Sequence, residues 1–191
     1  MAGHKFDFAK LDKLRDPDRL RSQDPERIWS LIAAKAPRVV VDIGAGIGFF
    51  ALPFARAMPE GKVYAADIEP KMLDALRGIL REEGVDNIEA LSCEEAHVPL
   101  PDGCADVVFM ANLHHEFDHP LTSLRDALRL LRVGGSLAIF DWDVVDSEKG
   151  PPLHVRVAPD EVTTQLNEVG FTEVARHDGF PYHYLITATK A

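Results

Sequence analysis

The sequence predicts an α/β fold in which a mainly parallel sheet carries helices on both faces. Three observations lead to this prediction. Short apolar runs rich in β-branched residues alternate with longer segments of helical periodicity. A glycine-rich turn joins the first apolar run directly to a helix. The last two strand-like segments, 172–177 and 184–189, are too close for a helical crossover, so they should pair antiparallel near one edge.

Composition and charge narrow the possible functions. The 191 residues fit one domain, and 21 Lys and Arg against 31 Asp and Glu give a formal net charge of −10. This negative net charge does not fit a protein that binds the phosphates of nucleic acid, or one that lies on a membrane through a basic helix. Cys93 and Cys104 form neither a disulfide framework nor a zinc knuckle, and no segment resembles a signal peptide or membrane span. We therefore expect a cytoplasmic protein without nucleic-acid or membrane partners, and the sequence leaves its oligomeric state open.

The first half of the chain supplies the opening helices and strands. Asp24 as a capping residue and Pro25 at the first helical position predict a helix that continues to Pro37. The β-branched run 39–41 predicts a strand buried on both faces. Next come a helix at 49–57, a strand at 63–66, a helix at 70–83 closed by Gly84, and a strand at 88–91.

The second half continues the alternation. A strand at 107–110 is followed by an amphipathic helix at 121–131 and a turn at Gly134 and Gly135. A strand at 136–140 and a helix at 159–169 lead to the two final strands, with Gly170 as the helix cap.

The turn after the first strand predicts a binding site, because ligands of open α/β sheets lie at the carboxyl ends of the strands. Gly44, Gly46 and Gly48 would let the backbone approach a ligand closely, unless they merely permit a tight turn. Asp67 ends the second strand, where its carboxylate could accept hydrogen bonds from both ribose hydroxyls or simply cap a helix. Asp42 precedes the turn, where it would repel phosphates and attract a sulfonium or ammonium group. The pattern favours S-adenosylmethionine over a dinucleotide.

Residues 39–55 resemble the first motif of the class I S-adenosylmethionine-dependent methyltransferases, in particular the small-molecule, quinone-biosynthesis type. Segments 65–72, 93–108 and 124–135 resemble later motifs of that family and follow in the expected order. The resemblance covers about residues 25–191. It implies a Rossmann-like sheet of seven strands in the order 3-2-1-4-5-7-6, with the last strand antiparallel.

The resemblance also implies the residues of the cofactor site. Asp67 would hold the ribose, and Ile68 would lie against the adenine. Glu94 would stand near the adenine amino group, and Glu95 would offer its backbone. The full set that we assign to S-adenosylmethionine is Asp42, Gly44, Ala45, Gly46, Asp67, Ile68, Met72, Glu94, Glu95 and Asn112.

Polar residues after the fourth and fifth strands are candidates to act on the methyl acceptor. His114 and His115 are the candidate catalytic residues, because a histidine can act as a general base near neutral pH. His114 is favoured because it comes first after the strand; alternatively, one histidine packs on the next helix and the other is solvated. We assign no metal to this pair. Asp141 and Trp142 could supply a carboxylate and an aromatic wall or cap a turn, and Arg156 could receive an anionic substrate or pair with the acidic surface.

These features predict transfer of a methyl group to a small-molecule acceptor by in-line displacement. No large insertion offers a surface for a macromolecular substrate. We expect residues 1–23 to form a lid and residues 24–191 to form the methyltransferase domain. A nicotinamide-dependent oxidoreductase and a non-catalytic S-adenosylmethionine-binding regulatory module are the alternatives.

Overall fold

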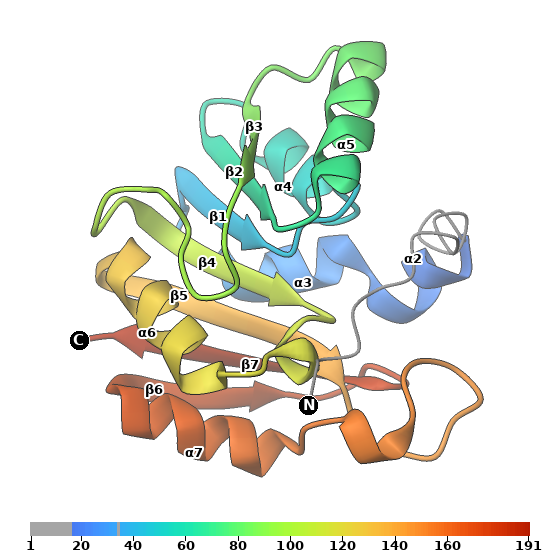
Figure 1. Ribbon diagram of the computed structural model, residues 1–191, viewed down its shortest axis with the longest axis vertical. Coiled ribbons are helices and arrows are strands. Elements are labelled where there is room, and N and C mark those ends of the chain that lie inside the picture. Colours follow the sequence, from blue (N-terminus) through green and yellow to red (C-terminus); the bar gives the residue numbers. More distant parts are fainter. Residues whose placement is uncertain (1–16, 34) are drawn as a thin grey trace.

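A computed structural model describes residues 17–33 and 35–191, whose strands form one seven-stranded sheet. Figure 1 shows the arrangement of this sheet and its helices. The strand order is β3-β2-β1-β4-β5-β7-β6, as predicted. The neighbouring strands from β3 to β5 pair in parallel, whereas β7 pairs antiparallel with both β5 and β6. The strands are β1 Val39–Ile43, β2 Lys62–Asp67, β3 Ile88–Ser92, β4 Ala105–Ala111, β5 Leu131–Trp142, β6 Phe171–His177 and β7 His183–Lys190.

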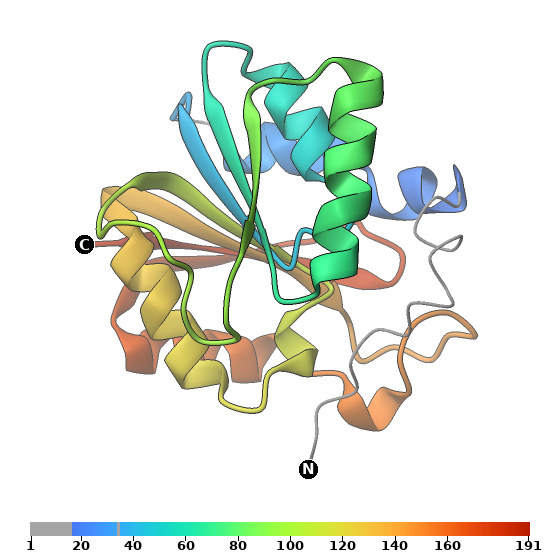
Figure 2. The same ribbon diagram turned by 45° about the horizontal axis from the view of Figure 1, so that its top comes forward.

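Helices cover both faces of the sheet (Figures 1 and 2). One face carries α3 (Pro25–Ile32), α4 (Ala51–Ala57) and α5 (Pro70–Glu83), and its core includes Phe54 and Leu76. The other face carries α6 (Pro120–Leu130) and α7 (Pro159–Val169). Burial of these apolar faces against the sheet is the main stabilising contribution to the fold. None of the helices in the described part of the chain is both long and apolar enough to span a membrane.

Local signals set most of the predicted helix ends. Asp24 caps α3 by accepting a hydrogen bond from the backbone N–H of Arg27 at 3.1 Å, and Gly84 and Gly170 end α5 and α7 in the left-handed conformation. The predicted end of α3 at Pro37 is wrong, because the helix stops at Ile32. The chain must turn early into β1, whose first residue Val39 donates its N–H to the Asp106 carboxylate at 2.8 Å.

The predicted turn at Gly134 and Gly135 is also wrong, because both residues lie inside β5. Leu131 already pairs with Ala105, and the register then shifts so that Ser136 pairs with Val107. The extra residues form a bulge in which Gly134 has a φ of 74°, a conformation that favours glycine. The helix α6 therefore ends at Leu130, and the strand begins five residues before the predicted start at Ser136.

Three short elements gather at the carboxyl edge of the parallel strands. The helix α2 (Pro17–Gln23), the 3-10 helix η2 (His114–Glu116) and the 3-10 helix η3 (Leu153–Val155) lie there, together with the loop that follows β5 (Figures 1 and 2). Because this edge is the binding edge of open α/β sheets, these elements are positioned to border a ligand.

Candidate functional site

The glycine turn between β1 and α4 is bonded to the end of β2. The backbone N–H groups of Gly44 and Ala45 donate to the Ala66 carbonyl at 2.8 and 3.1 Å, and that of Gly46 donates to Asp67 Oδ2 at 2.8 Å. A Cβ added to Gly44 would lie 2.8 Å from Leu113, whereas one added to Gly46 would meet nothing within 4 Å. The space beside Gly46 is therefore open, and a ligand could approach the backbone there.

Asp42 brings a buried carboxylate to this turn. Its side chain is 2% exposed, and Oδ2 has no hydrogen-bond partner. Burial, and then the charge of Asp67, raise the pKa of Asp42 well above its ordinary value, although a backbone hydrogen bond from Ala51 opposes this. An uncompensated buried carboxylate is costly. The cationic end of S-adenosylmethionine fits this position, because it would supply the missing partner.

Asp67 lies beside Asp42 at the end of β2. Its Oδ1 accepts a hydrogen bond from the backbone N–H of Glu69 at 2.9 Å, and burial raises the pKa of Asp67 despite its backbone bonds. The neighbouring Ile68 is 45% exposed, which is unusual for a large apolar side chain. A carboxylate next to an exposed aliphatic surface suits a nucleoside, since the ribose hydroxyls donate and the base needs an apolar contact.

Other residues predicted to bind the cofactor have structural contacts. Met72 is buried in α5. The backbone of Glu94 forms an isolated bridge with His97. The Glu95 carboxylate accepts the backbone N–H of Asp118 at 2.9 Å, and its carbonyl accepts the Ser123 hydroxyl at 3.2 Å. The structure thus groups Asp42, Gly44, Ala45, Gly46, Asp67 and Ile68 at the ends of β1 and β2, whereas Glu95 supports the segment after η2.

Asn112 connects the loop after β4 to α2. Its backbone is left-handed, with a φ of 53°, and its Nδ2 donates to Gln23 Oε1 at 3.3 Å. Arg19 donates to the same oxygen at 3.0 Å, and its guanidinium lies 4.0 Å from the Phe49 ring centroid. Residues 17–23 of the predicted lid therefore pack beside the site as α2, while residues 1–16 lie outside the described part of the chain.

The two adjacent histidines have different surroundings. His114 is 1% exposed, and its Nε2 donates to Gln165 Oε1 on α7 at 2.8 Å. His115 donates from Nδ1 to Asp141 Oδ1 at 2.7 Å, and its Nε2 lies 3.9 Å from Glu116 Oε1. The carboxylate at the end of β5 therefore fixes the His115 tautomer and leaves Nε2 as the basic nitrogen.

These surroundings shift the two histidine pKa values in opposite directions. Burial lowers the pKa of His114, and its bond to Gln165 and the charge of Asp141 only partly oppose this. Burial also acts to lower the pKa of His115, but the hydrogen bond and charge of Asp141, with Glu116, outweigh it and raise that pKa. His115 is consequently the stronger base of the pair.

Unpartnered buried atoms gather at this same edge. Within residues 17–33 and 35–191, four buried side-chain atoms lack a hydrogen-bond partner: Asp42 Oδ2, His114 Nδ1, His183 Nδ1 and the Tyr184 hydroxyl. His183 stacks on Phe140 on one face of the sheet, whereas Tyr184 packs in the core on the other face, so these atoms lie at the ends of strands on both faces. Most buried polar groups in folded proteins are hydrogen-bonded, so such atoms suggest an edge where other molecules bind. Sequence reasoning missed Gln23, His183 and Tyr184. The antiparallel direction of the last strand was the available signal, because it puts the start of that strand at the binding edge.

Arg156 organises the loop after β5. Its guanidinium donates five hydrogen bonds of 2.8–3.1 Å, four to backbone carbonyls and one to the Ser147 hydroxyl. It also lies 5.4 Å from the Trp142 ring centroid. All five N–H donors are used within the loop, so Arg156 neither receives an anionic substrate nor pairs with the acidic surface. Both interpretations from the sequence are wrong, because the loop folds around this side chain.

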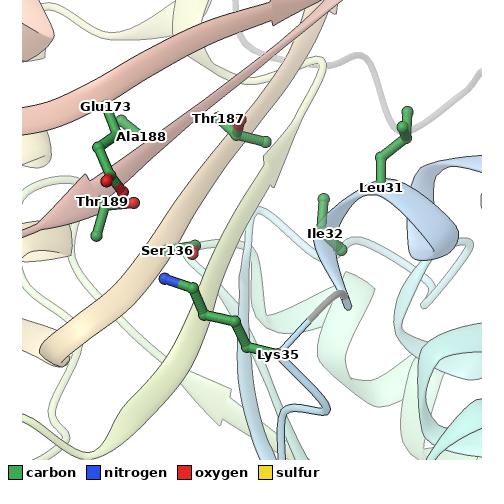
Figure 3. A pocket seen from close by; sticks show the side chains of 8 residues that line it. All are labelled: Leu31, Ile32, Lys35, Ser136, Glu173, Thr187, Ala188 and Thr189. Atoms are coloured by element: carbon green, nitrogen blue, oxygen red, sulfur yellow. The ribbon is translucent and has the colours of Figure 1, made fainter.

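A separate hollow of about 210 Å³ lies at the opposite edge of the sheet. Figure 3 shows Lys35 extending toward Ser136 there, and Lys35 Nζ donates to the Gly134 carbonyl at 3.1 Å. The hollow is lined by Leu31, Ile32, Lys35, Ser136, Glu173, Thr187, Ala188 and Thr189. It is distant from the glycine turn because Ser136 lies at the start of the regular β4–β5 pairing. In the described part of the chain, no three His, Cys, Asp or Glu side chains are arranged to hold a metal ion.

Comparison with known proteins places the chain in a family. The family model described as "Methyltransferase domain" matches residues 40–135. A solved structure of an S-adenosylmethionine-dependent methyltransferase from Aquifex aeolicus is 35% identical, with a TM-score of 0.91 over 98% of this chain and 100% of that one.

Two curated relatives are ubiquinone/menaquinone biosynthesis C-methyltransferases. The protein from Cupriavidus pinatubonensis is 31% identical over 143 residues, and that from Ralstonia pickettii is 34% identical over 143 residues. Each match covers 72% of this chain and 57% of the relative. This chain thus spans little more than half the length of these relatives. Together with the fold and the glycine turn, the comparisons show that the chain belongs to the class I S-adenosylmethionine-dependent methyltransferase family.

Proposed function

We propose that the protein binds S-adenosylmethionine at the carboxyl ends of β1, β2 and β4 and transfers a methyl group to a small molecule. The observation that carries this proposal is the buried Oδ2 of Asp42, which lacks a partner, and the turn that follows Asp42 has open space at Gly46. Asp42 would hold the cationic end of the cofactor, and Asp67 would hold its ribose. When bound, S-adenosylmethionine supplies an electrophilic methyl group on a sulfonium.

His115 would act as the general base on the acceptor. Its Nδ1–H is held by Asp141, so Nε2 carries the lone pair that can take a proton from an acceptor hydroxyl or amine. Deprotonation makes the acceptor more nucleophilic before the methyl group is transferred. His114, the residue favoured from the sequence, would instead position this segment, since its Nε2 is engaged by Gln165.

The acceptor would be a small molecule of the phenol or hydroquinone class. The curated relatives are named for C-methylation in ubiquinone and menaquinone biosynthesis, which motivates this choice. Trp142 at the end of β5 is only partly buried, and its aromatic ring suits a flat acceptor. We further propose a cytoplasmic location and no nucleic-acid partner, in keeping with the acidic composition.

Two alternatives are less well supported. A nicotinamide cofactor needs free backbone N–H groups for its pyrophosphate, but those of Gly44, Ala45 and Gly46 already bind Ala66 and Asp67. The carboxylates of Asp42 and Asp67 would also repel phosphates. A non-catalytic regulatory module would not need the His115–Asp141 pair beside the cofactor site.

Calorimetry and a transfer assay test the proposal. S-adenosylmethionine should bind to the purified protein, NADH should not, and Asp42→Asn should weaken the S-adenosylmethionine affinity at least about tenfold. Radiolabel from the cofactor methyl group should appear in a phenol or hydroquinone acceptor, with release of S-adenosylhomocysteine. Binding of NADH alone would support the oxidoreductase. Cofactor binding without transfer to any phenol, hydroquinone, thiol or amine would support the regulatory module.

A further inference from the structure

His183 is held rigidly at the binding edge by two aromatic rings. It is the first residue of β7 and lies opposite Trp142 in the antiparallel register. Its imidazole stacks on Phe140, with ring centroids 4.5 Å apart and planes 9° apart, and its centroid lies 4.1 Å from that of Trp142. The side chain is 3% exposed. Packing therefore determines where both ring nitrogens lie.

A chain of hydrogen bonds from α2 fixes the tautomer of His183. The Arg19 cation can only donate, so Gln23 Oε1 must accept its bond. Asn112 donates to the same oxygen through Nδ2, which directs Asn112 Oδ1 toward His183. His183 Nε2 lies 3.0 Å from that oxygen and must carry the proton. Nδ1 therefore carries a lone pair.

This lone pair is buried and has no partner. Burial lowers the pKa of His183 to about 3, so the ring is neutral at physiological pH and Nδ1 remains an acceptor. A buried acceptor without a donor costs free energy, and proteins usually fill such a position. The other three unpartnered atoms lie at the same edge, and the charges of Asp141 and His115 act on His183. His183 packs against Phe140 and Trp142, whose neighbour in β5 is Asp141, so it lies close to the pair proposed to be catalytic.

We propose that Nδ1 of His183 binds the methyl acceptor by accepting a hydrogen bond from an O–H or N–H group of that molecule. This inference rests on the proposed methyltransferase function. The two histidines would then have different roles. Neutral His183 would position the acceptor, and His115 would take its proton. A site that contains such an acceptor atom discriminates against an analogue without a donor, because that analogue leaves the buried nitrogen unpaired.

Nitrogen-15 NMR of histidine-labelled protein tests the hydrogen bond directly. In protein saturated with S-adenosylhomocysteine, His183 should show the Nε2–H tautomer. Addition of hydroquinone should shift the Nδ1 resonance toward that of a hydrogen-bonded nitrogen. The dimethyl ether of hydroquinone has the same ring and no donor, so it should leave this resonance in place. A shift caused by S-adenosylhomocysteine alone, with none on adding hydroquinone, would assign Nδ1 to the cofactor and overturn the proposal.

Two variants provide a matched pair. His183→Asn keeps an oxygen near the position of Nδ1, whereas His183→Gln keeps only the polar end that faces Asn112, and both lose the aromatic ring. We expect hydroquinone to bind the loaded His183→Gln protein about tenfold more weakly than the loaded His183→Asn protein. The two affinities for S-adenosylhomocysteine should agree within about twofold.

The outcomes separate this inference from the proposed function. If wild-type protein does not bind S-adenosylhomocysteine, the methyltransferase proposal fails. If it binds S-adenosylhomocysteine but binds neither hydroquinone nor 4-aminophenol, or binds hydroquinone and its dimethyl ether equally, the role of His183 is rejected. Should either variant fail to fold, the NMR measurement on wild-type protein decides alone.

Discussion

The imidazole of His115 donates a hydrogen bond from Nδ1 to Oδ1 of Asp141 at 2.7 Å, and its backbone N–H donates to the second oxygen at 3.0 Å. Asp141 thereby fixes both the ring and the main chain of the residue that we propose as the base. Replacement of Asp141 by Asn should lower kcat/KM about 100-fold, because the tautomer and basicity of His115 are no longer maintained. Steady-state assays check this, with Asp143→Asn as the control for loss of a neighbouring carboxylate.

The pH dependence of activity should change with the same substitution. The Asp141 carboxylate raises the pKa of His115, and a general base works only when it is deprotonated. Activity of the wild type should therefore rise as pH increases through this raised pKa. In Asp141→Asn the rise should occur at lower pH. If the rise of kcat/KM with pH occurred at the same pH in Asp141→Asn as in the wild type, His115 would be excluded as the titrating base.

Removing the charge of Asp42 should stabilise the protein and weaken cofactor binding. Because its pKa is higher in the folded protein than the ordinary 3.8, wild-type stability should fall as pH rises from about that value through the raised pKa. The Asp42→Asn variant has no buried carboxyl that ionises at this position. Without ligand, its free energy of unfolding at pH 7 should therefore be about 1–2 kcal/mol higher than that of the wild type. Denaturant unfolding at pH 3 and pH 7 measures the difference, which should vanish at the lower pH.

The open space beside Gly46 leads to a prediction with a close control. Gly46 and Gly84 both have a positive φ, of 55° and 64°, and an added Cβ at either would meet nothing within 4 Å. Alanine at either position should therefore cost about 1–2 kcal/mol of backbone strain. Only Gly46→Ala should weaken S-adenosylmethionine binding, by more than about tenfold in calorimetry. Equal affinities for the two variants would show that no ligand approaches Gly46.

Arg156→Lys should loosen the loop after β5. A lysine ammonium has three N–H donors and cannot replace the five hydrogen bonds of the guanidinium, so we expect a loss of about 2 kcal/mol in stability. Trypsin should then cleave after Lys149 in the variant faster than in the wild type, as mass spectrometry would show. Arg176→Lys is the control, because Arg176 is an exposed residue that bonds Asp143 at the start of this loop at 3.0 Å. Similar cleavage of both variants would contradict the role of Arg156.

Most of the fold could be predicted because its signals are local. The alternation of apolar runs and helical segments identified every strand, and the short connection between the last two strands identified their antiparallel pairing. The predictions were wrong where a tertiary contact decided the local structure. The bulge at Gly134 depends on the pairing of Leu131 with Ala105, and the end of α3 depends on the bond between Val39 and Asp106.

The sequence by itself determined the family and the positions of the glycine turn, Asp42 and Asp67, because each belongs to a local motif at the end of a predicted strand. Only the tertiary structure decided that His115 pairs with Asp141 and His114 with Gln165. Only it connected Arg19, Gln23, Asn112 and His183, which come from both ends of the chain and the loop between. The physical reason is that hydrogen bonding and burial, which fix a histidine's tautomer and pKa, depend on neighbours that folding brings from distant parts of the sequence.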